Sequence, residues 1–276
     1  MTDLNKKIAV VTGAAGGLGQ AISRRLATAG ATVVLADICE PARLESLAQE
    51  IAKSGCKAFA RRTDVSSSAD VDALFAEVKA RFGTVHILVN NAAIVPAQPE
   101  DEARRAKHYG YITTPVPRDT LKFTSQMSDE DWRRFWAVNV DGVFYGTRAA
   151  LRLMEPQRSG RIVNVASVAG YSPISAHSPH YSATKGAVIA FSKAVAAEVA
   201  GANIFVNVLA PGGIMTPDFK RYLDQVGEEK ARQLWQVVPL GRLGTPEEYA
   251  ETVLHLVGAD HYLVGQVISP NGGSII

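Results

Sequence analysis

Cysteine is scarce in this chain: Cys39 and Cys56 are the only two among 276 residues, and they do not form a CxxC pair. Two thiols without metal-ligand spacing argue against a cysteine metal site, so we expect reduced, structural thiols in a cytoplasmic protein. The six histidines are scattered without an HExxH arrangement. The sequence therefore predicts no bound metal.

Long hydrophobic runs and an excess of one charge are also missing. No run of 18 apolar residues occurs, and the first residues, MTDLNKK, lack a secretory hydrophobic region. Lys and Arg number 29 against 27 for Asp and Glu, and the two signs are interspersed, for a net charge of +2. We therefore expect neither a membrane nor a nucleic acid as a partner.

What the chain does have is enough apolar sequence for one large core. Hydrophobic residues make up 47% of the chain, which suits a single domain over residues 1–276. Strand-like runs alternate with helical patterns such as residues 70–82 and 185–200, which is typical of βαβ units. The strand-like runs are residues 8–11, 31–37, 86–92, 160–167, 204–210 and 265–273. This order predicts an α/β fold: a doubly wound, mostly parallel, Rossmann-type sheet with helices on both faces.

Three glycines follow the first strand-like run: Gly13, Gly17 and Gly19. A helical pattern then continues to Gly30. Glycines at such a junction let the backbone approach a pyrophosphate, which the free N–H groups at a helix start can bind. The spacing Gly-x-x-x-Gly-x-Gly is one residue longer than the usual dinucleotide fingerprint, so an ordinary glycine turn is the alternative.

Asp37 ends the second strand-like run, 18 residues after Gly19. An acid there can accept hydrogen bonds from an adenosine 2′-OH and repels a 2′-phosphate. No basic residue occurs from Ala14 to Gly16 or at Ile38. These features favour NAD over NADP, with a plain turn aspartate as the alternative.

Tyr181 and Lys185 are four residues apart in a helical pattern, so they share one helix face. A free phenol titrates near pH 10, and a nearby ammonium favours the phenolate. Lowering the pKa by about two units needs roughly 2.7 kcal/mol. The pair predicts proton transfer to or from a substrate, and Ser167, which ends a strand-like run, is placed to bind the substrate oxygen. Singly, Ser167 reads as a turn residue.

These motifs resemble the short-chain dehydrogenases/reductases over nearly the whole chain. TGAAGGLG is similar to their TGxxxGxG loop, NNAA at residues 90–93 to NNAG, YSATK to YxxxK, and LAPGGIMTP to the PG segment beside the nicotinamide. The resemblance implies that Tyr181 is the acid/base, Lys185 the pKa modifier and ribose ligand, and Ser167 the orienting hydroxyl. It also implies that Asn139 holds a water of the proton relay.

The same resemblance implies an NAD-binding set. That set comprises Gly13, Gly17, Leu18, Gly19, Asp37, Asp64, Val65, Asn91, Ala92, Tyr181, Lys185, Pro211, Gly212, Ile214 and Thr216. Asp64 and Val65 would contact the adenine, and Ile214 and Thr216 the carboxamide. Asp64 on its own reads as a turn residue, and Asn139 as an ordinary polar helix position.

Two departures from the family pattern stand out. Ala93 replaces the last glycine of NNAG, which requires the backbone there to avoid a positive φ or accept strain. Residues 94–126 form a long insertion rich in proline and mixed charge, for which we expect loop with one short helix at most. His108, Tyr109 and Tyr111 are candidates to line the substrate site, and a surface insertion or subunit contact is the equal alternative.

The combined motifs predict an NAD-dependent oxidoreductase that interconverts a secondary alcohol and a ketone, with oxidation favoured because NAD is preferred. The family resemblance implies a homotetramer. The alternative is a 3-oxoacyl-thioester reductase, in which Arg104, Arg105 and Lys107 meet a phosphopantetheine chain. A non-catalytic dinucleotide sensor is disfavoured because Tyr181 and Lys185 are both present.

Substrate identity does not follow from the motifs, because one fold serves many chemistries. We expect the pocket walls in residues 168–177, residues 213–235 and the insertion. Candidate side chains there are Tyr171, Ile174, Met215, Phe219, Tyr222, Leu234 and Trp235. They predict a small-molecule alcohol or ketone of apolar character.

Overall fold

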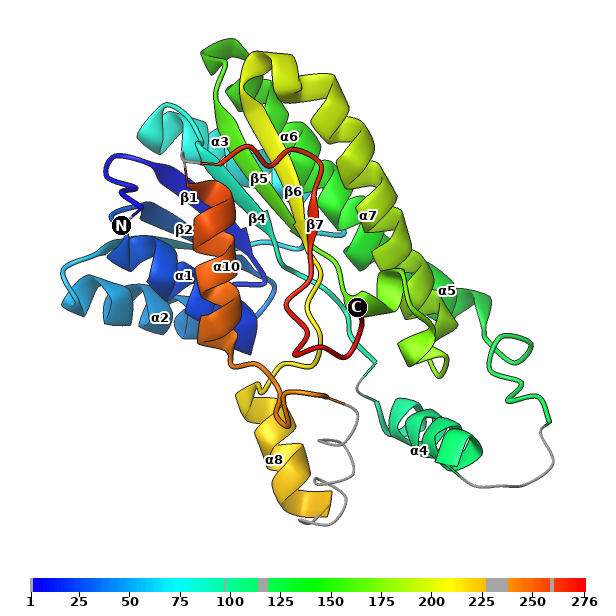
Figure 1. The fold of residues 1–276 in the computed structure, drawn as a ribbon. Coiled ribbons are helices and arrows are strands. Elements are labelled where there is room, and N and C mark those ends of the chain that lie inside the picture. The colour runs from blue at the N-terminus through cyan, green and yellow to red at the C-terminus, as the bar shows by residue number, and fades with distance from the viewer. Residues whose placement is uncertain (1, 97, 114–118, 227–237, 259–260) are drawn as a thin grey trace.

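A parallel seven-stranded sheet organises the protein, as a computed structural model shows (Figure 1). The structure describes residues 2–96, 98–113, 119–226, 238–258 and 261–276. The strands are β1 (Ile8–Thr12), β2 (Thr32–Asp37), β3 (Lys57–Arg62), β4 (Ile87–Asn90), β5 (Gly160–Val165), β6 (Ile204–Leu209) and β7 (Val267–Ile268). Their order is β3-β2-β1-β4-β5-β6-β7, with every neighbouring pair parallel. The predicted doubly wound α/β class is confirmed.

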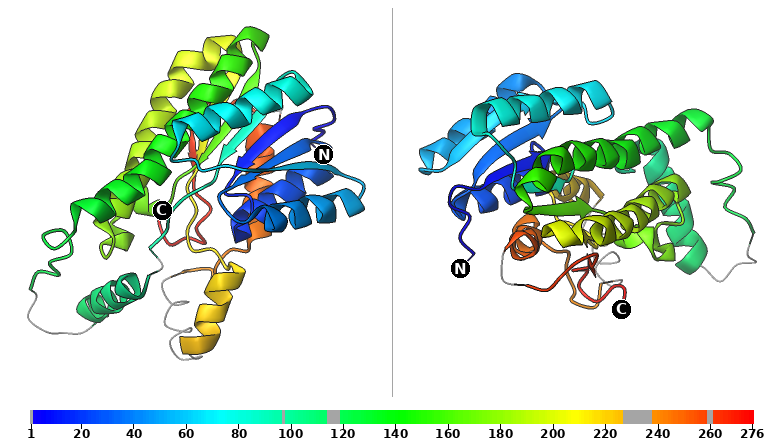
Figure 2. Two further views of the ribbon diagram at one scale, coloured as in Figure 1. Left: turned by 180° about the vertical axis from the view of Figure 1, so that it is seen from behind. Right: turned by 90° about the horizontal axis from the view of Figure 1, so that it is seen from above.

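Helices cover both faces of the sheet (Figure 2). On one face α1 (Gly17–Thr28), α2 (Pro41–Lys53) and α10 (Pro246–Val257) bury their apolar sides. On the other face lie α3 (Ser68–Phe82), α6 (Gly142–Gln157) and α7 (Pro179–Val199). Neighbouring strand residues alternate between the faces: Val11 packs in the first layer and Val10 in the second. Because both faces are covered, the central strands are almost wholly apolar.

Strand β3 was not among the predicted strands, and its sequence explains why. It reads KAFARR and lies at the sheet edge, where its burial pattern runs from exposed ends to a half-buried middle. Charged residues on an edge strand discourage pairing with other chains, but they also hide the apolar signal that marks a central strand.

The 94–126 insertion contains a longer helix than expected, α4 (Pro99–Thr113). Pro99 starts the helix, three acids occupy its first turn, and an Asp101 carboxylate oxygen accepts a hydrogen bond from the Gln98 N–H. Proline at the first helical position and acids near the N-terminus both stabilise a helix, so these residues, which suggested a loop, begin one. The insertion therefore contains a helix, as expected, but at 15 residues it is longer than the short one predicted.

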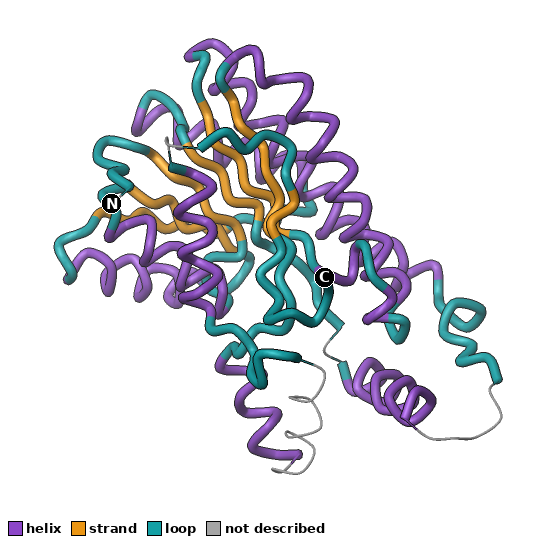
Figure 3. The backbone as a smooth tube through the Cα atoms, viewed as in Figure 1, coloured by secondary structure: helices purple, strands orange, loops and turns teal. Residues whose placement is uncertain are grey.

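Helices α4 and α8 (Pro217–Val226) lie beyond the end of the sheet at which the strands finish, among the connecting loops (Figure 3). Helix α5 (Asp129–Trp136) follows the insertion, and the Ser128 hydroxyl accepts the Asp131 N–H at its start. A π-helix, Ala137–Asp141, joins α5 to α6. Short 3-10 turns occur at Val168–Gly170, Pro173–Ser175 and Ala200–Ala202.

Buried amides tie β4 and β5 to the helices behind them. The Asn90 Nδ2 donates to the Asn164 Oδ1 at 2.8 Å and to the Thr147 hydroxyl at 3.1 Å, while the Asn164 Nδ2 donates to the Ser192 hydroxyl at 2.8 Å. Gly146 of α6 faces this network, and a Cβ built on it would lie 2.4 Å from the Asn90 Oδ1. The close approach of α6 to the sheet therefore depends on the missing side chain.

We predict that Gly146→Ala lowers the free energy of unfolding by about 1–3 kcal/mol, because its methyl group must displace a buried amide. Gly110→Ala is the matched control: Gly110 lies in α4 with nothing within 4 Å of its built Cβ. The control should stabilise the protein by about 0.5–1 kcal/mol through helix propensity. Urea denaturation of both variants checks this, and equal effects would contradict the packing argument.

Candidate active site

One pocket of about 960 Å³ opens at the carboxyl edge of the sheet. It is lined by every residue of the predicted catalytic and cofactor-binding set except Asn139. Those residues are Gly13, Gly17, Leu18, Gly19, Asp37, Asp64, Val65, Asn91, Ala92, Ser167, Tyr181, Lys185, Pro211, Gly212, Ile214 and Thr216. Residues as far apart in sequence as Gly13 and Thr216 thus meet at one edge, as expected where parallel strands end.

The glycine loop has the geometry of an anion site. Helix α1 begins at the N-cap Gly16 without a side-chain cap, so its first N–H groups have no acceptor inside the helix. Gly13 has a positive φ of 63°, and a Cβ on Gly19 would lie 2.0 Å from the Gly13 carbonyl oxygen. Side chains are excluded at both positions, and the bare backbone fits a pyrophosphate.

Asp37, at the end of β2, lines the pocket beside the glycine loop. Its carboxylate accepts the Ala15 N–H at 2.9 Å and the Cys39 N–H at 3.0 Å, which fixes it between the glycine loop and the end of β2. Arg43, from the first turn of α2, donates to the Ala15 carbonyl at 2.8 Å. Sequence spacing missed this arginine because α2 brings it back to the loop from outside the motif.

The turn after β3 also lines the pocket. The Asp64 Oδ1 accepts both the Ser66 N–H, at 2.9 Å, and the Ser66 hydroxyl, at 2.7 Å. Val65 is buried against Gly142 of α6 and lines the pocket. A carboxylate and an aliphatic side chain in this position can hold the edge and face of a planar base.

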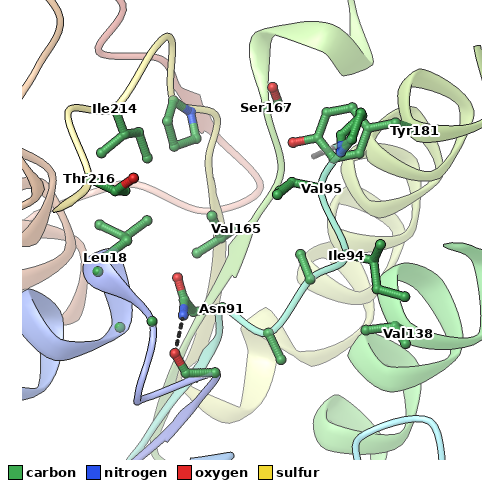
Figure 4. Close-up of a pocket in the computed structure, with 18 of the residues that line it drawn as sticks. Leu18, Asn91, Ile94, Val95, Val138, Val165, Ser167, Tyr181, Ile214 and Thr216 are labelled. Atoms are coloured by element: carbon green, nitrogen blue, oxygen red, sulfur yellow. Dashed lines mark hydrogen bonds between the residues drawn. The ribbon is translucent and has the colours of Figure 1, made fainter. Parts of the chain in front are cut away.

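The end of β4 forms the floor of the pocket (Figure 4). The Asn91 Nδ2 donates to the carbonyls of Thr12 and Gly13, and the Thr12 hydroxyl accepts the N–H groups of Asn91 and Ala92. Ala93 does not adopt a positive φ, so the alanine here is accommodated without strain.

The segment after β6 forms the opposite wall, with Ile214 and Thr216 across the pocket from Tyr181 (Figure 4). The Pro211 carbonyl accepts the Val168 N–H, and the Gly212 N–H donates to the Pro270 carbonyl. The Thr216 hydroxyl accepts the Phe219 N–H at 3.2 Å, at the start of α8. The wall is therefore anchored to its neighbours by backbone bonds.

Tyr181 and Ser167 lie on the same side of the pocket (Figure 4). Ser167 follows β5, where its hydroxyl accepts the Ala169 N–H at 3.1 Å. Burial raises the pKa of Tyr181 above its ordinary value of 10, and a hydrogen bond with Ser167 opposes that rise. The sequence analysis expected a lowered pKa. The difference arises because removing the phenolate from water dominates.

Lys185 lies beneath Tyr181 and is 2% exposed. Its Nζ donates to the Val165 carbonyl at 2.9 Å and lies 5.7 Å from the centre of the Tyr181 ring. Burial lowers the pKa of Lys185 from about 10.5 to about 8. The ammonium is thus close to losing its proton near neutral pH.

Asn139 lies in the π-helix and is fully buried. Its Oδ1 accepts the Ile94 N–H at 2.8 Å, and its Nδ2 donates to the Ile94 carbonyl and to the Thr184 hydroxyl. Both amide hydrogens are used within the protein. The side chain therefore joins the loop after β4 to α7.

The substrate side of the pocket differs from expectation. The insertion contributes Glu102 and Arg105, and the turn before α7 contributes Ser175 and His177. His108, Tyr109 and Tyr111 do not line the pocket, and His108 is buried against His177 at 5.8 Å between ring centres.

Of the predicted apolar side chains, Phe219 lines the pocket, whereas Ile174 and Met215 do not. Tyr171 is exposed and its hydroxyl donates to Ser269, which removes it from the pocket. Leu234, Trp235 and the side chain of Tyr222 lie outside the described residues. The lining mixes Val95 and Phe219 with the charged Glu102 and Arg105, and the apolar character of the substrate stays a prediction.

Other expected features can be stated briefly. Cys39 and Cys56 are free thiols. Across the described ranges, no group of three His, Cys, Asp or Glu residues could hold a metal ion. In the same part of the chain, no helix has the length and apolar character needed to cross a membrane.

Comparison with known proteins gives one family. A sequence model described as short chain dehydrogenase matches residues 7–226. A 3-oxoacyl-[acyl-carrier-protein] reductase from Synechocystis is 35% identical, and the match covers 100% of both chains. The 3-oxoacyl-[acyl-carrier-protein] reductase FabG from Aquifex aeolicus is 36% identical over 98% of each chain.

Solved structures agree. A short-chain dehydrogenase/reductase from Serratia marcescens superposes with a TM-score of 0.82 at 29% identity, covering 98% of each chain. A short-chain type dehydrogenase/reductase from Mycobacterium marinum has a TM-score of 0.80 at 31% identity, covering 99% of this chain and 96% of its own.

We predict that Lys185→Met raises the free energy of unfolding by about 1–3 kcal/mol near pH 7, although it removes a group of the pocket. The buried lysine has a pKa of about 8, so below that pH its charge is held at a cost, partly offset by the bond to Val165. In the wild type this cost is complete below pH 8 and disappears as the pH rises toward 10.5.

Urea denaturation at about pH 7 and about pH 9.5 measures the gain, which should shrink at the higher pH. Lys193→Met is the surface control, because Lys193 lies on the same helix, is exposed and does not line the pocket. This variant should change stability little at either pH. A loss of stability in Lys185→Met at both pH values would contradict the assignment of a costly charge.

Proposed function

This chain belongs to the short-chain dehydrogenase family, whose members are oxidoreductases that use a nicotinamide dinucleotide, and we propose that it reduces the carbonyl of a 3-oxoacyl thioester. One observation carries the reaction type: Ser167, Tyr181 and Lys185 meet at one pocket beside an uncapped helix start. The substrate class rests on the full-length relatives named as 3-oxoacyl-[acyl-carrier-protein] reductases.

Two hydroxyls bind and protonate the substrate in this proposal. The carbonyl oxygen accepts hydrogen bonds from Ser167 and Tyr181, and the Tyr181 phenol transfers its proton to that oxygen. Burial raises the pKa of Tyr181, which keeps the phenol protonated at neutral pH. A protonated phenol is the form that a reduction requires, and we propose reduction in place of the oxidation expected from the sequence.

The bound nicotinamide supplies the hydride to the carbonyl carbon. Lys185, as an ammonium, stabilises the phenolate that Tyr181 becomes and is placed to bind the nicotinamide ribose. Asn139 holds Ile94 and Thr184 in place through its side chain. A relay water at Asn139 therefore has the backbone carbonyl as its available acceptor, and proton return to Tyr181 through such a water is part of the proposal.

The remaining residues of the pocket are proposed to hold the dinucleotide. The loop from Gly13 to Gly19, including Leu18, binds the pyrophosphate. Asp64 and Val65 bind the adenine, and Asn91 and Ala92 contact the adenosine half of the cofactor. Pro211, Gly212, Ile214 and Thr216 enclose the nicotinamide. We propose NAD(H) as the preferred cofactor, because the Asp37 carboxylate, which two backbone N–H groups hold beside the glycine loop, can accept a hydrogen bond from a ribose 2′-OH and repels a 2′-phosphate.

A simple secondary alcohol or ketone is the second candidate substrate. The observation in its favour is the apolar part of the lining, which includes Val95 and Phe219. A homotetramer and a cytoplasmic location remain predictions from the sequence, and a non-catalytic sensor is disfavoured by the assembled hydroxyls and lysine.

The test is the oxidation of NADH and NADPH with the N-acetylcysteamine thioester of acetoacetate, compared with a neutral ketone of equal length. We predict faster turnover of the thioester, and a fall of about 10²–10⁴-fold in kcat for Tyr181→Phe because proton transfer is lost. The affinity for NADH should change little, since the phenol acts on the substrate. Full activity of Tyr181→Phe would overturn the acid role, and equal turnover of thioester and ketone would leave the second candidate.

Cofactor choice gives a separate prediction. Asp37→Ser should raise kcat/KM for NADPH by about 10- to 100-fold, because a like charge next to the 2′-phosphate is removed. Arg43 donates to the carbonyl of Ala15, the residue whose N–H Asp37 accepts, so its guanidinium is close enough to bind the 2′-phosphate once the carboxylate is gone. Adding Arg43→Gln should reverse most of the gain. An Asp37→Ser enzyme that still discriminates fully against NADPH would show that another group sets the preference.

A further inference from the structure

The insertion carries three neighbouring basic side chains, and the structure gives each a different environment. Arg104 forms an ion pair with Asp101 at 3.5 Å. Lys107 donates to the Leu121 carbonyl and lies over the Phe123 ring, on the exposed side of α4. Arg105 alone among the three lines the pocket.

Arg105 is held in place without an acid. Its guanidinium donates to the Pro96 carbonyl at 2.9 Å, and no ion pair to a carboxylate joins it within the ranges that the structure describes. A single carbonyl leaves most of its five N–H donors for other acceptors. A half-buried guanidinium anchored by one backbone oxygen is therefore ready to bind an anion in a bidentate manner.

His177 faces the same space from the turn before α7. It lines the pocket, is 6% exposed, and its Nδ1 is buried without a hydrogen-bond partner. Burial, followed by the positive charge of Arg105 and the neighbouring histidines His108 and His180, lowers the pKa of His177 to about 4. The imidazole is neutral at physiological pH, and the potential that it experiences is positive.

Glu102 is the opposing charge, since it also lines the pocket one helical turn before Arg105. Glu102 is exposed, whereas Arg105 is half-buried and anchored. Among its neighbours, Arg105 contributes the largest Coulomb effect on the pKa of His177, ahead of His108 and His180. The inner part of this end of the pocket is therefore cationic, and the carboxylate lies nearer the solvent.

We propose that Arg105, together with His177 and Ser175, forms a binding site for an anionic group of the substrate, at the end of the pocket that the insertion closes. The inference deepens the proposed function, because the anion belongs to the molecule whose carbonyl Tyr181 protonates. Arg105 is the ligand for the anion, and His177 and Ser175 each offer one hydrogen bond to it.

A 3-oxoacyl thioester can carry an anion in two places: a carboxylate at the far end of the acyl chain, or the phosphate of a phosphopantetheine arm. Three probes with the same reacting carbonyl separate these sources. They are acetoacetyl-N-acetylcysteamine, which is neutral, acetoacetyl-phosphopantetheine, and the N-acetylcysteamine monothioester of a 3-oxo dicarboxylic acid, whose far carboxylate is free.

The measurement is kcat/KM for each probe with wild type, Arg105→Gln, Glu102→Gln and the control Lys107→Gln. We expect the wild type to prefer one anionic probe, and Arg105→Gln to reduce that preference by about 10- to 100-fold through KM, as for the loss of a charge-assisted hydrogen bond. Glu102→Gln should change the preference in the opposite direction by a few-fold. Lys107→Gln should leave all three values unchanged, and the anionic probe that responds identifies the source.

The outcomes separate the two proposals. Turnover of the neutral thioester tests the proposed function on its own, whatever Arg105 does. If no thioester reacts, a 4-oxo acid and its methyl ester give the same ratio and still test the anion site. The site is overturned if Arg105→Gln lowers kcat/KM equally for charged and neutral probes, as a purely structural role would, or if the wild type shows no preference for either anionic probe.

Discussion

Four hydrogen bonds between the ends of β1 and β4 hold together everything that the pocket requires. They join Thr12 and Gly13 to Asn91 and Ala92, at the place where the strand order reverses. From this point the glycine loop turns toward α1 and the segment after β4 turns toward the insertion. A crevice must open between chains that leave neighbouring parallel strands in opposite directions, and this crevice is the pocket. These four hydrogen bonds hold the ends of β1 and β4 close together, and a Cβ on Gly13 would lie only 2.7 Å from the Ala92 Cα.

Burial governs the chemistry at the other end of this crevice. It raises the pKa of Tyr181 and lowers that of Lys185, so each group is driven toward its neutral form. The neutral tyrosine is the proton donor, whereas the neutral lysine no longer carries the charge that stabilises the phenolate. A pocket dry enough to keep the phenol protonated therefore also weakens the cation that supports the phenolate. The Val165 carbonyl, which accepts from the Lys185 Nζ, limits this weakening by binding the ammonium form.

The sequence predicted the half of the site whose residues follow directly from strand ends and the family motifs. Gly19, Asp37 and Tyr181 could be selected because each comes at a fixed place after a recognisable apolar run, and the sheet then brings them together. Arg43 and His177 could not be selected. Arg43 reaches the glycine loop only because α2 folds back along the sheet, and His177 faces the pocket only because of the turn before α7. Such contacts depend on the path of the chain in three dimensions, and no local spacing records it.

The insertion shows the same limit more sharply, since its sequence suggested mostly loop, whereas residues Pro99–Thr113 form a helix that contributes Glu102 and Arg105 to the pocket. The contact between α4 and the rest of the protein is largely polar: Asp101 and His108 are buried, and His108 lies against His177. Burying such groups without full hydrogen bonding costs stability, as the unpartnered Nδ1 atoms of His108, His177 and His180 indicate. An apolar seat for α4 would be more stable. The polar one places Arg105 and His177 at the substrate, so the part of the chain that departs from the family pattern is also the part that can distinguish one substrate from another.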